Sequence, residues 1–382
     1  MTAPYAESWQ YFMESSLILR TLDLAASIQQ IPAPTFDEAR RAAYVYERFQ
    51  DEGLPDVSMD DAGNVYARLP GSGSAPPLVV SAHLDTVFPA DTELSICRSA
   101  QTIAGPGIGD NSLGVASLFF LVWALRSPIT GLTSLPGDIW LAANTCEEGL
   151  GDLVGMRAVV DRFGAQARAY LILEGMALGQ VYHRGLGVRR YRIEAETAGG
   201  HSWVDFGEPS AIHALAHLVA RLAAIPLPQE PRTSLNVGIF SGGTSINTIA
   251  AQAYCLLDLR SEDRKTLDSL ATKVEDMVDE ANQPGKAMVK ASLVGSRPVG
   301  ALPLSHPLVS LAIRCLELQG IQPHPNIGST DANLPLSRGL PAVCLGVTKG
   351  SGAHTTGESV ETRPLRQGLA QLLEFVKSVY FI

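Results

Sequence analysis

Two adjacent glutamates, Glu147 and Glu148, stand where the apolar run of LAANTCEEGLGDL gives way to glycines. Neighbouring residues of a strand point to opposite faces, so a regular strand cannot direct both carboxylates at one spot. The plain interpretation is a solvated loop after a buried strand. The alternative is a site in which two carboxylates have two different tasks, and the other acids and histidines of the chain bear on that choice.

A histidine and an aspartate end another apolar run. His83 and Asp85 are two residues apart in VVSAHLDTV, so both lie on one face of the predicted strand. A metal-bound imidazole needs an acceptor for its second nitrogen, and an aspartate one strand step away can supply it. A His-x-Asp pair is common, so this pair alone does not identify a site.

Three more candidate residues stand at a strand end or in glycine-rich loops. Asp110 lies in GPGIGDNSLGVA before a buried helix, where it could either cap that helix or bridge two cations. Glu174 directly follows the apolar run of AYLILEGM, and His354 lies in GAHTTGES. Singly, each residue favours a structural role. Together they indicate one site, because the strand ends of an α/β sheet line a single crevice.

The elements that position these residues alternate between strand and helix, which predicts an α/β fold with a central sheet flanked by helices. Thr35, with Glu38 three positions on, is expected to cap the helix over 35–53. The expected helices of this part span 15–31, 35–53, 113–127, 152–164, 306–320 and 364–381, and the expected strands 64–71, 76–87, 137–148, 169–175 and 341–347.

Residues 188–298 follow a different pattern and predict an inserted domain. Strand 188–197 alternates with a period of two, as expected for a half-exposed strand. It is followed by helix 210–224, strands 234–240 and 253–260, helix 264–282 and strand 287–295. This βαββαβ order is typical of an α+β sandwich with one exposed sheet face. The expected organisation is therefore a catalytic domain in two parts, 1–187 and 299–382, with an inserted dimerisation or lid domain.

The composition limits the class of protein. The chain has 382 residues, 46% of them hydrophobic and 18% charged, with a net charge of −10 and no basic run, which argues against nucleic acid as a partner. The N-terminus has no signal-peptide pattern, and the apolar run GVASLFFLVWAL is too short to span a bilayer. The five cysteines are expected to be reduced core residues. These features predict a cytoplasmic protein without a membrane partner.

Taken in order, the motifs HLD, GDN, EEG, LEG and AHTTGE, with GGHS and GGTSIN between them, resemble those of the co-catalytic metallohydrolase family. This family includes aminoacylase, acetylornithine deacetylase, succinyl-diaminopimelate desuccinylase, glutamate carboxypeptidase and tripeptide aminopeptidase. The resemblance extends from about residue 15 to the end of the chain. Each motif is weak alone, and their order makes the set specific.

The resemblance implies two zinc ions per subunit, with Co²⁺ or Mn²⁺ as possible substitutes. His83 and Glu174 would hold one ion, Glu148 and His354 the other, and Asp110 would bridge both. Two metals about 3.5–4 Å apart can activate a shared water and polarise an amide carbonyl. The resemblance also implies a cis peptide bond after Asp110.

The resemblance assigns further roles by position. Glu147 would be the general base and Asp85 would support His83, which gives the two neighbouring glutamates different tasks. His201, in TAGGHSW, would reach the active site of a partner subunit and stabilise the oxyanion. Asn247 and Arg260 would contact the substrate, and Arg260 is suited to gripping a free carboxylate in bidentate fashion.

The expected activity is hydrolysis of an amide bond in a small peptide or N-acyl amino acid. Glu174 favours a carboxypeptidase or deacylase, whereas the segment GSTDANLPLSRGLPAV is closer to peptidase-like members, which keeps a narrow-specificity di- or tripeptide aminopeptidase open. A non-catalytic dimeric binding protein is the third alternative. The expected partner is a second copy of the chain, joined through the inserted domain, and a tetramer is also compatible.

Overall fold

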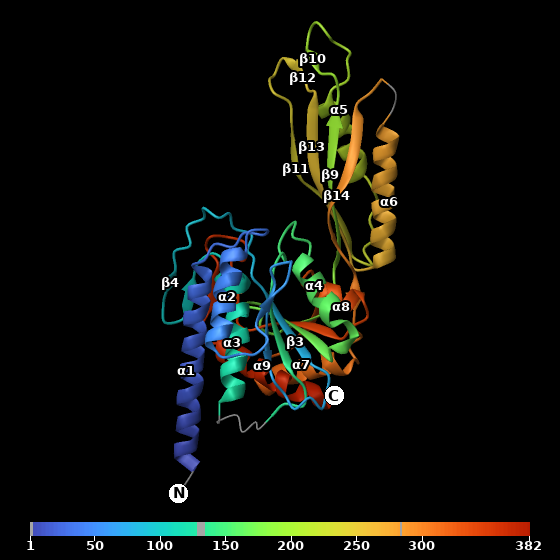
Figure 1. The fold of residues 1–382 in the computed structure, drawn as a ribbon. Coiled ribbons are helices and arrows are strands. Elements are labelled where there is room, and N and C mark those ends of the chain that lie inside the picture. Colours follow the sequence, from blue (N-terminus) through green and yellow to red (C-terminus); the bar gives the residue numbers. More distant parts are fainter. Residues whose placement is uncertain (1–2, 128–133, 283–284) are drawn as a thin grey trace. The chain divides into compact units, whose positions relative to one another are not determined.

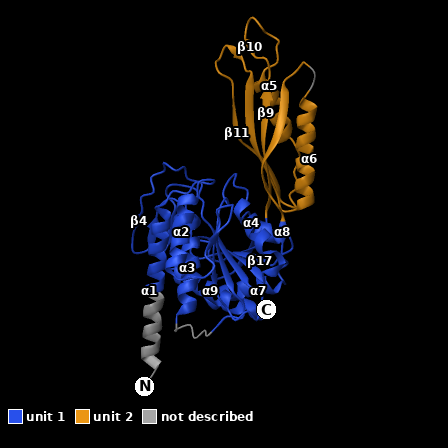
Figure 2. Cartoon of the chain, in the orientation of Figure 1, with its two compact units in different colours: residues 1–185, 300–382 blue, residues 186–299 orange. Residues whose placement is uncertain are grey.

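The computed structural model describes residues 3–127, 134–282 and 285–382, with side chains from residue 16 onward. The chain forms two compact units, coloured separately in Figure 2. Unit 1 comprises Met1–Gly185 and Gly300–Ile382, and unit 2 comprises Leu186–Val299. Each unit has its own hydrophobic core.

A mixed sheet forms the centre of unit 1 (Figure 1), in the order β1-β2-β6-β3-β7-β17-β8-β15, with β16 also paired to β8. Strands β6, β3, β7 and β17 are parallel and almost fully buried, which explains their continuous apolar sequences. The strands are β1 (Ser58–Met59), β2 (Val65–Leu69), β3 (Leu78–His83), β6 (Ile139–Asn144), β7 (Ala169–Glu174), β8 (Gln180–Gly185), β15 (Gly300–Ala301), β16 (His324–Gly328) and β17 (Ala342–Gly346).

Helices cover both faces of this sheet. Helices α1, α2, α3, α7 and α9 pack on one face, where Phe49 of α2 stacks on Phe119 of α3, and α4 and α8 pack on the other. The helices are α1 (Ala3–Gln29), α2 (Ala39–Asp51), α3 (Leu113–Arg126), α4 (Val154–Phe163), α7 (Pro307–Leu318), α8 (Asn333–Ser337) and α9 (Leu365–Ser378). Ile108–Arg126 is long and apolar enough to cross a membrane, but 94% of this stretch is buried inside the fold, as in a core helix.

A small four-stranded sheet holds two loops of unit 1 together. Its order is β18-β19-β5-β4, and the pairing of β19 with β5 places the loop after residue 350 beside the segment that leads to Asp110. The strands are β4 (Cys97–Arg98), β5 (Thr102–Ala104), β18 (Gly350–Ser351) and β19 (Ser359–Glu361).

Unit 2 is a four-stranded antiparallel sheet, in the order β11-β13-β9-β14, with two helices on one face. Residues of β9 and β13 alternate between buried and half-buried, because their other face is not covered by helices. Two short strands far apart in the chain, β10 and β12, pair as a separate two-stranded antiparallel sheet. The elements are β9 (Gly187–Glu196), β10 (Gly200–His201), α5 (Ala211–Ala223), β11 (Thr233–Gly242), β12 (Thr248–Ile249), β13 (Gln252–Ser261), α6 (Arg264–Ala281) and β14 (Met288–Arg297).

The predicted fold class is confirmed: a mixed sheet with helices on both faces, and an α+β insert of βαββαβ order. The sequence analysis missed β8, β16 and the small sheet, whose strands are short or carry charged residues. Two local predictions are wrong. Thr35 and Glu38 do not form a capping box, since α2 begins at Ala39 and Glu38 makes no side-chain cap. Cys97 is exposed, whereas the other four cysteines are buried; all five are free.

We predict that unit 1 folds without unit 2. Gly185 of β8 and Gly300 of β15 are paired, so replacing residues 186–299 by Asn-Gly would close these strands as a hairpin. The shortened chain should be monomeric and should unfold in one cooperative thermal transition, measured by circular dichroism. Aggregation, or a transition without cooperativity, would contradict the division into two independent cores.

Candidate metal centre

Four side chains of unit 1 converge around the carboxylate of Asp110, and we refer to these five residues together as the Asp110 cluster. One oxygen of Asp110 lies 3.0 Å from Nε2 of His83, and the other lies 3.2 Å from Nε2 of His354. Oε2 of Glu174 is 3.7 Å from the same nitrogen of His83, and Oε1 of Glu148 is 3.1 Å from that of His354. The carboxylate of Asp110 therefore stands between two His–Glu pairs that are far apart in the chain.

The donor atoms form three overlapping groups, within each of which all atoms lie within 4.8 Å of one another. Two groups share Asp110, and the third contains Glu147. Nitrogen and carboxylate oxygen donors in this arrangement fit two divalent cations such as Zn²⁺. The groups are His83, Asp110 and Glu174; Asp110, Glu148 and His354; and His83, Glu147 and Glu148.

Electrostatics show that this cluster attracts positive charge. Burial favours neutral His83, but the neighbouring carboxylates of Asp110, Asp85 and Glu174 outweigh it and raise its pKa well above 6.5. Hydrogen bonds to Asp110 and Glu148 raise the pKa of His354 to about 10. Without a metal, the imidazoles therefore hold protons that compensate the carboxylates, and divalent cations can take over this role.

The two neighbouring glutamates reach the site because the chain leaves the strand before them. β6 ends at Asn144, and Cys146 adopts a left-handed conformation with φ of 55°. The backbone amides of Glu147 and Glu148 then both donate to the carboxylate of Asp85, at 2.9 and 2.8 Å. Strand alternation, which would separate the two side chains, no longer applies in this turn, and both are almost fully buried.

Asp85 holds the turn that carries Glu147 and Glu148 more directly than it holds His83. Nδ1 of His83 lies 3.0 Å from the backbone oxygen of Asp85 and 3.5 Å from its carboxylate. The carboxylate oxygens accept instead from the two glutamate amides and from the hydroxyl of Thr35, at 2.9 Å. The expected acceptor for the second imidazole nitrogen is thus chiefly the aspartate's carbonyl, not its side chain.

Asn111 has a role that the sequence analysis did not assign. Its amide nitrogen donates to the backbone oxygen of Leu173 at 2.8 Å, and its amide oxygen accepts from the backbone amide of Gly175 at 2.9 Å. These bonds hold the chain on both sides of Glu174. Gly114 leaves the required space, because a Cβ there would lie 1.9 Å from the amide oxygen. The peptide bond between Asp110 and Asn111 is cis.

Glu358 and Arg41 were also missed: Glu358 fixes the backbone of a candidate ligand, and Arg41 fixes the residue directly after one. The carboxylate of Glu358 accepts from the amides of Gly107, Gly109 and Asp110 at 3.2, 2.6 and 2.8 Å. The buried guanidinium of Arg41 donates to the backbone oxygen of Leu84 at 2.7 Å. The only sequence signal was position: Glu358 stands four residues after His354, in the same glycine-rich loop.

The three predicted site residues of the insert lie in unit 2. His201 is exposed in β10, and its Nδ1 accepts from the amides two and three residues on. Asn247 is exposed in the turn directly before β12, where its side chain accepts from Ser245. Arg260 is half-buried on β13, and its Nε donates to Asp258 at 2.7 Å. These three residues belong to unit 2 and the Asp110 cluster belongs to unit 1, and their roles stay predictions.

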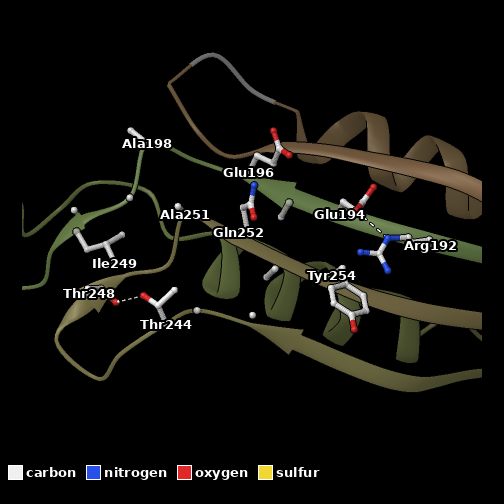
Figure 3. Close-up of a pocket in the computed structure, with 16 residues that line it drawn as sticks. Arg192, Glu194, Glu196, Ala198, Thr244, Thr248, Ile249, Ala251, Gln252 and Tyr254 are labelled. Carbon is white, nitrogen blue, oxygen red and sulfur yellow. Dashed lines mark hydrogen bonds and ion pairs between the residues drawn. The ribbon is translucent and has the colours of Figure 1, made fainter.

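A cavity of about 500 Å³ lies in unit 2 beside the paired strands β10 and β12 (Figure 3). Arg192 donates to Glu194 at 2.8 Å and lies over the ring of Tyr254. Neither the Asp110 cluster nor His201, Asn247 or Arg260 lines it. The cavity is therefore lined by none of the predicted site residues.

Comparisons with known proteins agree with this fold. A family model described as a peptidase dimerisation domain matches residues 186–286, and one described as peptidase family M28 matches residues 64–183. The chain is 24% identical to succinyl-diaminopimelate desuccinylase of Corynebacterium glutamicum over 92% of its own length and 95% of that protein. It is 27% identical to a probable carboxypeptidase of Aspergillus terreus, over 53% and 48% of the two chains.

Solved structures show the same fold over nearly the whole chain. A tripeptidase of Staphylococcus aureus has a TM-score of 0.80 at 22% identity, and aminopeptidase PepT of Bacillus cereus has 0.75 at 23%; each match covers 95% of this chain and 98% of the other. A Bacillus subtilis protein described as a dinuclear metal-binding peptidase of the M20 family has 0.66 at 15%, over 96% and 99%. The chain is thus similar in fold to these peptidases, one of which is described as a member of the M20 family.

Proposed function

We propose that the protein is a dinuclear metallohydrolase that cleaves an amide bond in a small peptide or N-acyl amino acid. The observation that carries this proposal is the carboxylate of Asp110, whose two oxygens face two different His–Glu pairs. His83 and Glu174 would hold one ion, Glu148 and His354 the other, and Asp110 both. Bound there, two zinc ions would polarise the amide carbonyl and make a water molecule more acidic.

Glu147 is proposed as the general base, with the two glutamates in different roles. Its side chain is almost fully buried beside the cluster, and its backbone amide is held by Asp85. From this position the Glu147 carboxylate would take a proton from the attacking water and pass it to the leaving amine. Asp85 would act as a positioning residue, since it fixes the turn that carries both glutamates.

Unit 2 is proposed to complete the site in a homodimer. The match to a peptidase dimerisation domain supports pairing through this unit. His201 would stabilise the oxyanion in the partner's site, while Asn247 and Arg260 would contact the substrate. Arg260 already pairs with one carboxylate, that of Asp258, which illustrates the contact that it would make with a substrate carboxylate.

The relatives' names support a deacylase or carboxypeptidase, and the solved structures include aminopeptidases. We favour a deacylase or carboxypeptidase, because Glu174 fits that group and the desuccinylase relative spans nearly the whole chain. We further propose a cytoplasmic location, which the five free cysteines support.

Metal removal is expected to abolish activity and lower thermal stability. Zinc- or cobalt-loaded protein should hydrolyse N-acyl amino acids and amino-blocked dipeptides, and dialysis against EDTA should stop this. Bound ions stabilise a fold by about 2.7 kcal/mol at a hundredfold excess over Kd, so Tm should fall by a few degrees and recover on reloading. Hydrolysis that is insensitive to chelation would contradict the proposal, and hydrolysis of carboxyl-blocked substrates alone would favour an aminopeptidase.

The substitution Glu147→Gln is expected to lower kcat by about 10²–10⁴-fold, because the amide cannot accept a proton. Metal content, measured by elemental analysis, should stay at two ions per subunit. Glu148→Gln provides the matched control one residue along the chain and should reduce the bound metal. Loss of an ion from Glu147→Gln would identify Glu147 as a ligand instead.

Mixed dimers test whether His201 acts across the subunit interface. His201→Ala and Glu147→Ala homodimers should both be nearly inactive. Dimers with one subunit of each kind should regain about one competent site, because one site would receive an intact base and an intact partner histidine. No recovery after verified subunit exchange would mean that His201 does not act on the partner's site.

A further inference from the structure

Phe36 has an unusual conformation for its residue type. It occupies the third position of a four-residue turn, closed by a 2.8 Å bond from the amide of Asp37 to the oxygen of Pro34. Its φ is 77°, a value that glycine or asparagine normally supplies in such a turn, and its side chain is 67% exposed. Neither the turn nor the core requires an aromatic ring at this position, where glycine would suit the backbone better.

Hydrogen bonds link the residues on either side of Phe36 to the loop that carries Glu147 and Glu148, which we call the catalytic loop. The hydroxyl of Thr35 donates to Asp85, which holds the amides of both glutamates. Glu38 accepts from the amide of Phe36 and, with the same oxygen, from the amide of Cys146, directly before Glu147. The turn of Phe36 is therefore coupled by hydrogen bonds to the loop of the proposed general base. The ring of Phe36 lies next to these hydrogen bonds.

Two other exposed apolar side chains adjoin the same network. Val87 is 39% exposed and follows Thr86, whose backbone pairs with Pro34. Leu150 is 52% exposed and precedes Gly151, where a Cβ would lie only 2.7 Å from the methyl group of Thr35. We refer to Phe36, Val87 and Leu150 as the apolar rim. Three separate segments thus expose an apolar residue where they meet the catalytic loop.

We propose that Phe36, within this apolar rim, contacts an apolar acyl group or side chain of the substrate and so determines which substrates are hydrolysed. This inference rests on the proposed function. The occupant follows from these links: if Glu147 acts at the scissile bond, a ring joined through Thr35 and Glu38 to the loop of Glu147 would lie beside a neighbouring part of the same substrate. Contact with substrate would explain why an exposed aromatic ring occupies a position with a strained backbone.

The test compares Phe36→Gly with wild type on metal-loaded, full-length protein. The substrates are N-acyl amino acids in two series, one with the acyl chain lengthened from acetyl to octanoyl and one with the side chain enlarged from glycine to leucine and phenylalanine. Phe36→Gly should lower kcat/KM by about tenfold or more for apolar members of one series and by less than twofold for the smallest member. The affected series identifies the group that is bound.

Controls separate specificity from folding. Tm of Phe36→Gly should equal or exceed that of wild type, because glycine tolerates the positive φ. Phe36→Leu should restore most of the preference, and Met59→Ala, at a 46% exposed position on β1, should change nothing. An equal loss on all substrates, or no loss, would overturn the inference with the proposed function intact. Wild-type protein that hydrolyses no member would overturn both.

Discussion

The site depends on one constraint: three carboxylates and two imidazoles meet in a largely buried space, and only positive charge makes that arrangement favourable. Asp110 is at its centre, because each of its oxygens faces a different imidazole. The raised pKa values of His83 and His354 reflect the same constraint, because the protonated imidazoles supply positive charge next to the carboxylates. Divalent cations bound by the same nitrogen and oxygen atoms would supply this positive charge instead. The proposed chemistry follows from the charge of these cations.

Buried polar side chains hold this cluster in place through hydrogen bonds to the backbone around the candidate ligands. Asp85 binds the amides of both glutamates, Asn111 binds the chain on both sides of Glu174, and Glu358 binds the amide of Asp110. Each of these groups is fully buried, so replacing it would leave a backbone group without a partner. Removing such a partner typically costs about 1–3 kcal/mol. Precise placement of the ligands therefore rests on polar groups that touch no substrate.

Sequence patterns were sufficient for the fold class because the buried strands and amphipathic helices have clear periods. They also singled out the residues of the Asp110 cluster, because these acids and histidines stand at strand ends or in glycine-rich loops. They failed where the side chain bonds to distant backbone. Glu38 has the spacing of a capping residue, yet its carboxylate binds the amide of Cys146, 108 residues away. Asn111 and Glu358 likewise act through tertiary contacts that no local pattern encodes.

The same limit applies to the two neighbouring glutamates. Strand alternation correctly indicated that a regular strand could not use both, but not that Cys146 would turn the chain before them. Phe36 has a positive φ in a local turn, and Cys146 has one where its amide donates to the distant Glu38, and neither residue type is one that normally adopts such a φ. These departures from local preference lie beside the metal centre, where such strain is commonly found.

The most direct test of the central claim is anomalous scattering at the zinc edge from crystals of the zinc-loaded protein. The account predicts two peaks per subunit on either side of the Asp110 carboxylate, one reached by His83 and Glu174 and the other by Glu148 and His354, with Glu147 coordinating neither. A single peak, peaks remote from Asp110, or an ion ligated by Glu147 would contradict it.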